Sequence, residues 1–291
     1  MKYLSIFLLS AFISSCCGTK KAIETQPEET KEVVVVTEVP DNIEPPLVQE
    51  APEPPKVEEE EKLLPPPPKP PKEPLNYKEI MHNRWDKILQ KYISQNGNID
   101  YKAIRNDRSE FDVYIDYLSD NLPNEEWSKE EKLAYWINAY NALTVDLIIR
   151  NYPTNSIKDV KDPWDQRLWK FGNKWLNLND IEHKILRKMD EPRIHFAIVC
   201  ASESCPKLQN EAFNSKNLEA QLTNATKEFL SDTSKNEISK DRIKLSKIFK
   251  WFKKDFEQDG SLIDFLNQYS EVTISSSAKK SYKDYNWELN D

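Results

Sequence analysis

The residues best suited to chemistry gather in one stretch of the second half of the chain. His183 and His195 are two of the three histidines, and Cys200 and Cys205 are the two cysteines that follow the N-terminal pair. A histidine can take the proton of a cysteine, and the thiolate then acts as a nucleophile. This combination points to a thiol- or histidine-dependent hydrolase or transferase, with a cysteine as nucleophile and a histidine as base.

An acidic or amide side chain orients the base of such a centre, and Glu182 and Asn138 are the candidates for this role. The apolar run around His195 predicts a buried strand. His195 and Cys200 lie five positions apart along it, so their side chains would point to opposite faces. A direct pair of these two is therefore disfavoured, whereas a pair of His183 with either cysteine stays open.

The two cysteines also allow three other interpretations. Cys200 and Cys205 could form a structural disulfide, which export permits and which would stabilise so small a loop by about 2 kcal/mol. They could instead stay reduced and pack as small apolar core residues. A zinc site of two histidines, one cysteine and Glu182 is disfavoured, because the spacing matches no usual structural pattern. The sequence therefore predicts neither a metal nor a cofactor.

A long buried helix is expected to position part of this chemistry. Ser128 and Glu131 have the spacing of a capping box, and the run 133–150 is apolar on most faces. Asn138 and Asn141 lie on one face of it, and an unpaired buried amide costs about 1–3 kcal/mol. Either they tie a neighbouring loop to the helix, or they bind a ligand. The ligand-binding alternative groups them with Trp136, Tyr140, Glu182 and His183.

The remaining pattern predicts an α+β fold, mainly helical with a small β-sheet. Apolar residues at helical spacing and N-cap signals mark the helices, and short apolar or alternating runs mark the strands. The aromatic stretch 164–175 predicts a loop and a short strand. The other expected helices cover 77–93, 100–119, 178–187, 217–230 and 245–269, and the other expected strands cover 194–200 and 282–289.

The N-terminus predicts a bacterial lipoprotein. Lys2 and an apolar segment of about ten residues suit a signal peptide over residues 1–15. An aliphatic and two small residues precede Cys16, as in a lipidation signal, so Cys16 would carry acyl chains such as palmitate. Two or more chains anchor a protein stably to a membrane. We therefore expect a membrane-anchored protein of the bacterial cell envelope, at the outer membrane or facing the periplasm.

Composition separates a tether from a folded domain. Residues 21–75 hold 14 of the 19 prolines, no glycine, 14 acidic and 6 basic residues. Such a segment buries too little apolar surface to offset its chain entropy, so residues 16–75 are expected to form a disordered proline- and glutamate-rich tether. Residues 76–291 are expected to form a single globular domain. Its charge is close to neutral, which excludes a nucleic-acid binder that relies on a basic field.

The folded part also carries a series of recognisable motifs. They are WINAYNAL at 136–143, SI at 156–157, LNDIEHKILR at 178–187, RIHFAIVCAS at 193–202, SCP at 204–206, WFKKDF at 251–256 and YNWELN at 285–290. Together they resemble the family catalogued as domain of unknown function 547, over roughly residues 80–290. The resemblance implies a bacterial envelope or secreted protein and supplies no reaction. Asn286 stands where that family more often has aspartate.

A looser similarity concerns the order of the elements. A buried helix followed by a strand bearing a histidine is similar to papain-like and transglutaminase-like folds, although no cysteine opens this helix. Two functions follow. The first is an envelope module whose polar-lined cleft binds a peptide or glycan without turnover. The second is a hydrolase or transferase acting on an envelope substrate. Its catalytic candidates are His183, His195, Cys200, Cys205, Glu182 and Asn138.

Overall fold

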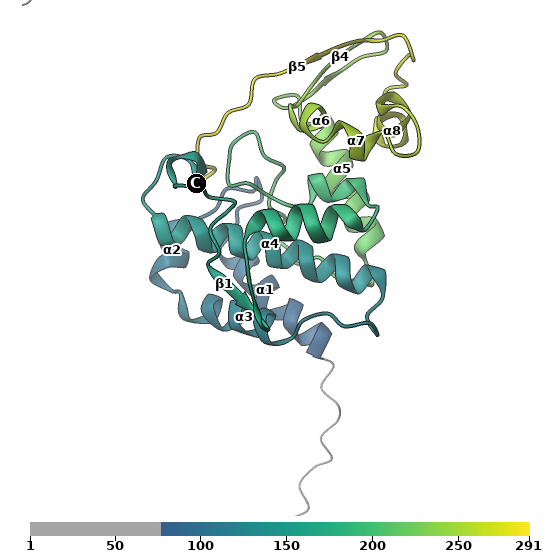
Figure 1. The fold of residues 1–291 in the computed structure, drawn as a ribbon. Helices are drawn as coiled ribbons and strands as arrows, with labels where there is room; N and C mark the ends of the chain where they lie inside the picture. The colour runs from purple at the N-terminus through teal and green to yellow at the C-terminus, as the bar shows by residue number, and fades with distance from the viewer. Residues whose placement is uncertain (1–76) are drawn as a thin grey trace, which may run out of the picture. The chain divides into compact units, whose positions relative to one another are not determined.

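The computed structural model describes the backbone of residues 77–291 and the side chains from His82 onward (Figure 1). The predicted signal peptide, the lipidation of Cys16 and the tether lie outside the described residues. None of the helices within residues 77–291 combines the length and the apolar character that crossing a membrane requires. The described part is mainly helical and holds a two-stranded and a three-stranded sheet, which confirms the mixed, helix-rich class.

Four α-helices form the first part of the fold. They are α1 (Tyr77–Tyr92), α2 (Tyr101–Asn106), α3 (Ser109–Asp120) and α4 (Lys129–Asn151). The continuous helix predicted over 100–119 is wrong, because the chain leaves the helical path at Asp107. The Asp107 carboxylate accepts hydrogen bonds from Lys91 Nζ at 2.6 Å and Tyr92 OH at 2.7 Å. Asp107, which lies between α2 and α3, is thus in contact with the end of α1.

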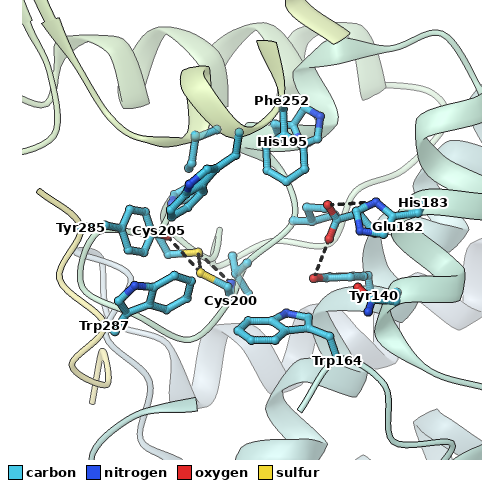
Figure 2. A pocket seen from close by; sticks show the side chains of 16 residues that line it. Tyr140, Trp164, Glu182, His183, His195, Cys200, Cys205, Phe252, Tyr285 and Trp287 are labelled. Carbon is cyan, nitrogen blue, oxygen red and sulfur yellow. Dashed lines mark hydrogen bonds and ion pairs between the residues drawn. The ribbon is translucent and has the colours of Figure 1, made fainter. Parts of the chain in front are cut away.

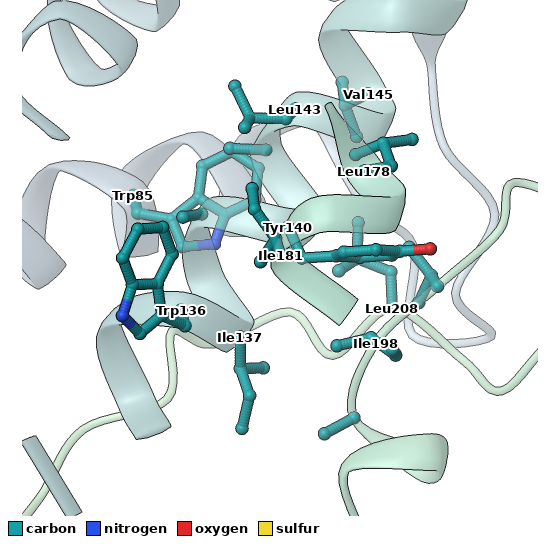
Figure 3. Packing of buried hydrophobic residues seen from close by; sticks show 14 of the residues in the cluster. Trp85, Trp136, Ile137, Tyr140, Leu143, Val145, Leu178, Ile181, Ile198 and Leu208 are labelled. Carbon is teal, nitrogen blue, oxygen red and sulfur yellow. The ribbon is translucent and has the colours of Figure 1, made fainter. Parts of the chain in front are cut away.

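Helix α4 is the central element of the core. Its predicted capping box is confirmed, since Ser128 Oγ accepts the Glu131 N–H and the Glu131 carboxylate accepts the Ser128 N–H. Every residue from Leu133 to Ile149 is buried. Figure 3 shows Ile181 and Ile198, from two later segments, packed with the apolar side chains of this helix. Polar side chains on α4 are therefore held in fixed positions against these segments.

Short elements connect α4 to the second half of the domain. They are η1 (Ile157–Asp159), β1 (Trp169–Phe171), β2 (Lys174–Leu176), η2 (Asp180–Ile185), η3 (Leu186–Lys188) and η4 (Pro192–Phe196). Strands β1 and β2 form an antiparallel hairpin. The helix predicted over 178–187 is present as the π-helix η2 followed by the 3₁₀-helix η3.

The strand predicted over 194–200 is wrong. A 3₁₀-helix occupies its first part, and Pro192, whose φ suits a helix start, begins it. Beyond it, Ala197 O and Val199 N–H bind the Asn141 side chain of α4 instead of a neighbouring strand. The continuous apolar character of this run therefore reflects burial against α4 and not a place in a sheet.

The rest of the chain surrounds a second hydrophobic cluster, which contains Phe196, Phe229, Phe249, Phe256 and Phe265. Figure 1 shows its helices α6, α7 and α8 gathered beside α5. In the three-stranded sheet, β4 pairs antiparallel with β3 and parallel with β5. The elements are α5 (Leu218–Ser231), β3 (Glu237–Ile238), β4 (Arg242–Leu245), α6 (Ile248–Trp251), α7 (Lys253–Phe256), α8 (Leu262–Tyr269) and β5 (Lys279–Tyr282).

Two predictions for this region need correction. The helix predicted over 245–269 is broken into α6, α7 and α8, with turns at Phe252 and around Gly260. The strand predicted over 282–289 lies earlier, at Lys279–Tyr282. Tyr282 pairs with Leu245, the last residue of β4, so the chain beyond it has no strand to pair with.

Candidate functional site

A cavity of about 220 Å³ lies where η2, the 195–206 segment, α6 and the 285–287 segment meet. Figure 2 shows the cysteine pair on one side, Glu182 and His183 on the other, and aromatic rings around both. The cavity is lined by Tyr140, Trp164, Asn179, Glu182, His183, His195, Ile198, Val199, Cys200, Cys205, Pro206, Ile248, Trp251, Phe252, Tyr285 and Trp287.

Cys200 and Cys205 are free thiols that contact each other in the cavity wall. Their sulfur atoms are 3.0 Å apart, and the Cys200 backbone N–H donates to Cys205 Sγ at 2.7 Å. Cys200 Sγ also lies 3.2 Å from Ser202 Oγ and 3.1 Å from Tyr285 OH. Cys200 is half-buried and Cys205 is buried. The disulfide considered from the sequence is not formed in this structure.

The two thiols differ in acidity. Hydrogen bonds, first from the Cys205 thiol and then from Ser202 and Tyr285, lower the pKa of Cys200 although burial opposes them. Burial raises the pKa of Cys205 well above its ordinary value, and the neighbouring Cys200 sulfur adds to this rise. Of the two thiols, Cys200 is therefore the one that ionises more readily. Since the thiolate is the nucleophilic form of cysteine, the reactive sulfur of this wall is that of Cys200.

Asn141 of α4 positions the segment that leads to Cys200. Its Nδ2 donates to Ala197 O at 2.9 Å, and its Oδ1 accepts the Val199 N–H at 3.0 Å. Directly after Cys200, Ala201 adopts a φ of 53°, a left-handed conformation that few residues other than glycine adopt. This turn is therefore held by its surroundings. Asn141 does not line the cavity but fixes one of its walls.

Asn138 and Trp136 lie away from this cavity. Asn138 Nδ2 donates to His82 Nδ1 at 2.9 Å and to Phe213 O at 2.7 Å, and its Oδ1 accepts the Phe213 N–H at 3.0 Å. Both asparagines of α4 thus tie neighbouring segments to the helix, as the structural alternative expects. Trp136 lines a separate cavity of about 750 Å³, together with Trp175.

Glu182 lies across the cavity from the thiols (Figure 2) and has one oxygen without a hydrogen bond. Its Oε2 accepts the Tyr140 hydroxyl at 3.1 Å. Its Oε1 is buried without a hydrogen-bond partner among the described residues, and His183 Nδ1 is 3.7 Å from it, beyond hydrogen-bond distance. Glu182 is only 6% exposed. An unpaired buried carboxylate oxygen costs free energy, so this atom is poised to accept a donor from a ligand.

The π-helix η2 places Glu182 and His183 side by side on the cavity. Its start is fixed by Asp180, whose N–H donates to Asn177 Oδ1 at 2.7 Å and whose carboxylate accepts a bond from Lys184 at 2.6 Å. π-Helical turns are rare and frequently occur at functional sites. Here the turn brings two consecutive side chains to one cavity, with the carboxylate buried and the His183 side chain 43% exposed.

An ion pair joins the two histidines of the cavity. Arg187 donates to Asp255 twice, at 2.5 and 2.7 Å, and its remaining nitrogen lies 3.0 Å from His183 Nδ1. His195 Nε2 lies 2.8 Å from Asp255 Oδ2. A carboxylate only accepts, so His195 Nε2 carries the proton. Burial lowers the pKa of His195 although Asp255 opposes this, which keeps the ring neutral. Within the described residues, neither histidine is hydrogen-bonded to a cysteine.

Within residues 82–291, no group of three or more His, Cys, Asp and Glu side chains is placed to hold a metal ion. His183 Nδ1 faces Arg187, and His195 Nε2 is bonded to Asp255.

Sequence reasoning missed the aromatic wall near the thiols. Trp251, Tyr285 and Trp287 form a cluster in which ring centroids are 4.6–5.8 Å apart. The 285–287 segment is held beside the thiols because the Glu203 and Ser204 N–H groups donate to its backbone and to that of Glu288. The occurrence of these aromatic residues in otherwise polar stretches could have marked them as candidates for a binding site. Their closeness to Cys200, however, cannot be predicted from the residues that surround them in the sequence.

Comparison with known proteins supports a family resemblance. No curated protein and no solved structure matches the chain. A family model described as "Protein of unknown function, DUF547" matches residues 124–230, inside the 80–290 range over which the motifs suggested the resemblance. The matched residues contain α4, η2 and both thiols. Through residues 124–230, which carry most of the cavity's polar groups, the chain is similar to the family described as protein of unknown function, DUF547.

Proposed function

We propose that the cavity binds a peptide, and that a basic or amide nitrogen of this peptide pairs with Glu182. The observation that carries the proposal is Glu182 Oε1, which is buried and has no hydrogen-bond partner among the described residues. An N–H donor of a ligand in the cavity would supply the hydrogen bond that this oxygen lacks. Hydrogen bonds to a charged acceptor are stronger than those between neutral groups. The carboxylate is already in place, so little binding energy is spent on arranging it.

The aromatic wall favours the same kind of ligand. Trp251, Tyr285 and Trp287 present ring faces and edges to the cavity, and Phe252 stacks on His195 with centroids 3.9 Å apart. Aromatic faces attract ammonium and guanidinium groups and can cover their apolar stems. A glycan could also stack here, but it brings no positive charge to Glu182. A peptide with a lysine or a free amine is therefore preferred over a glycan.

Binding is testable with the tripeptide Ala-Lys-Ala and with its doubly acetylated form, followed through tryptophan fluorescence of the cavity. The unmodified peptide should bind the full chain, and Glu182→Gln should weaken binding about 10- to 100-fold, the size of one charged hydrogen bond. Glu203→Gln, at an exposed site, is the matched control. Equal binding by both peptides, or binding of a neutral N-acetylglucosamine tetramer alone, would contradict the proposal.

A second candidate, a thiol-dependent hydrolase or transferase, is favoured by the Cys200 sulfur. It faces the same cavity as Glu182 and His183, and its pKa is lowered by three hydrogen bonds. The Cys200 thiol would lose its proton through solvent to His183 and attack an acyl carbonyl to form a thioester. The His183 imidazolium would protonate the leaving group, and the neutral ring would then take a proton from the water that hydrolyses the thioester. An activated ester should leave an acyl group on Cys200 that His183→Ala removes more slowly. Absence of any adduct would exclude this chemistry.

The setting that we propose is the bacterial cell envelope, with the domain anchored by lipid at Cys16. Its support is the sequence before Cys16 and the proline-rich composition that follows. Cys16→Ser should move the protein from the membrane fraction to the soluble fraction of cells, whereas Cys17→Ser should not. If both variants stay in the membrane fraction, another anchor holds the protein.

A further inference from the structure

The sulfur pair has a geometry that peptide binding alone does not explain. Cys200 Sγ and Cys205 Sγ are 3.0 Å apart, so an approach of about 1 Å would bring them to disulfide distance. Cys200 is half-buried, whereas Cys205 is only 3% exposed. A molecule that enters the cavity therefore meets Cys200 as the more accessible thiol, with Cys205 within reach of it.

We propose that Cys200 and Cys205 form a thiol–disulfide exchange site, in which Cys200 attacks a disulfide of a peptide in the cavity and Cys205 resolves the mixed disulfide. This inference rests on the proposed function in one respect, because the substrate is a peptide that occupies the same cavity. It does not depend on the pairing of that peptide with Glu182, so the two proposals can fail separately.

The surroundings of Cys200 suit an attacking thiol. Tyr285 OH and Ser202 Oγ lie 3.1 and 3.2 Å from its sulfur and can donate to the thiolate. These hydrogen bonds lower the pKa of Cys200, while burial raises that of Cys205. One accessible acidic thiol beside one buried, protonated thiol is the asymmetry that a two-step exchange requires.

The reaction balances without a further reactant. The Cys200 thiolate attacks one sulfur of the substrate disulfide, whose S–S bond breaks, and the released thiolate takes a proton from solvent. The Cys205 thiol then loses its proton to solvent and attacks Cys200 Sγ, which breaks the mixed disulfide and releases the second substrate thiol. Two electrons pass from the protein dithiol to the substrate, which is the oxidant. In the mixed disulfide Cys200 is neutral, so its charge no longer raises the pKa of Cys205.

Oxidised glutathione, a small peptide disulfide, is the probe for this reaction. The reduced full chain is treated with it, quenched in acid, alkylated and digested with trypsin, which releases residues 194–207 with both thiols on one peptide. The wild-type peptide should acquire an internal disulfide without retaining glutathione. Cys205→Ser and Cys205→Ala should each hold one glutathione on Cys200. Cys200→Ser should react at least about tenfold more slowly, since its remaining thiol is mostly protonated.

The hydrogen bonds to the sulfur have their own test. In Cys205→Ala, the midpoint of the pH dependence of Cys200 alkylation by iodoacetamide should rise when Tyr285→Phe is added. Tyr282→Phe, which removes a hydroxyl that makes no contact with either thiol, should leave this midpoint unchanged. An unchanged midpoint in Tyr285→Phe would mean that this hydroxyl does not stabilise the thiolate and would remove the basis for assigning the attack to Cys200.

Two outcomes would overturn the exchange site. The first is a wild-type peptide that stays fully reduced in excess oxidised glutathione. The second is a wild-type peptide that retains glutathione as long as the Cys205 variants do. The first readout uses the wild-type chain alone, and the second compares it with two different Cys205 variants. A wild-type chain that binds Ala-Lys-Ala but does not react with oxidised glutathione contradicts only the exchange proposal. The reverse result contradicts only the pairing of a basic peptide with Glu182.

Discussion

His195 Nε2 lies 2.8 Å from Asp255 Oδ2, so the buried histidine of the cavity is tied to helix α7. Asp255 is also held by two bonds from Arg187 on η3. Burial on its own would raise the pKa of Asp255, but the hydrogen bonds from His195 and Arg187 outweigh it and lower this pKa. One carboxylate therefore joins three separate elements around the cavity.

Substitution of this carboxylate should be costly. We expect Asp255→Asn to lower the free energy of unfolding by about 2–4 kcal/mol, because Arg187 loses its counter-charge in a partly buried position. Urea denaturation followed by circular dichroism measures the change. Asp259→Asn makes the same charge change at an exposed site and should stay within about 0.5 kcal/mol of wild type. Equal losses in both variants would show that net charge, and not this pairing, determines the effect.

The two asparagines of α4 provide a matched pair. Asn141→Ala and Asn138→Ala should each lower the free energy of unfolding by about 2–4 kcal/mol, because each leaves a buried backbone N–H and a carbonyl without a partner. Only Asn141 holds the segment that carries Cys200. The alkylation rate of Cys200 under native conditions should therefore change in Asn141→Ala alone. A similar change in both would mean that general loosening of α4 governs the thiol.

Glu182→Gln should separate binding from stability. The amide oxygen can still accept the Tyr140 hydroxyl, while the buried carboxylate oxygen that lacks a hydrogen bond is removed. We therefore expect an unfolding free energy that is unchanged or up to about 1 kcal/mol higher, together with weaker binding of Ala-Lys-Ala. Thermal denaturation by calorimetry tests this. A clear loss of stability would instead make Glu182 part of the scaffold.

His82 should make the fold sensitive to acid. Burial lowers the pKa of His82 from 6.5 to about 4. The unfolded chain therefore binds this proton more readily, and the contribution of His82 to stability is fully present above about pH 6.5 and lost as the pH falls towards 4. The free energy of unfolding should fall by up to about 3 kcal/mol over this window.

The matched measurement is the same titration in His82→Gln, which keeps an acceptor for Asn138. Its unfolding free energy should fall less steeply between pH 6.5 and pH 4, and the remaining slope would come from other groups, including the buried His195. Parallel slopes for the two proteins would show that His82 is not the group that titrates.

Local signals predicted those elements that depend on local chemistry. The capping box at Ser128 and the long apolar run after it specify α4 without reference to the rest of the chain, and α5 lies within one residue of its expected bounds. The strand prediction for 194–200 was wrong because a short apolar sequence is typical both of a buried strand and of an irregular segment that packs on a helix. The side chain that decides between them, Asn141, lies more than fifty residues earlier.

The site could be predicted only in part for the same reason. His183, Cys200 and Cys205 belong to the two rarest reactive residue types of the chain and lie close together in sequence, so counting was enough to select them, and Glu182 was selected as the neighbour of His183. Asp255 and Tyr285 belong to the site through contacts with residues 60 and 85 positions away. The residues next to them in the sequence give no indication of those contacts. The pairing of His195 with an acid on another element, and not with a thiol, likewise follows from tertiary packing alone.

Tyr285 follows all other residues that donate hydrogen bonds to Cys200 in the order of synthesis. While the chain is still being synthesised, Cys200 and Cys205 are present before the phenol of Tyr285 and the indole of Trp287. The hydrogen bond from Tyr285, one of those that lower the pKa of Cys200, therefore forms only after the 285–287 segment has been made and has packed beside Cys200. A chain that ends before Tyr285 should therefore have a Cys200 thiol that is less acidic than that of the full chain.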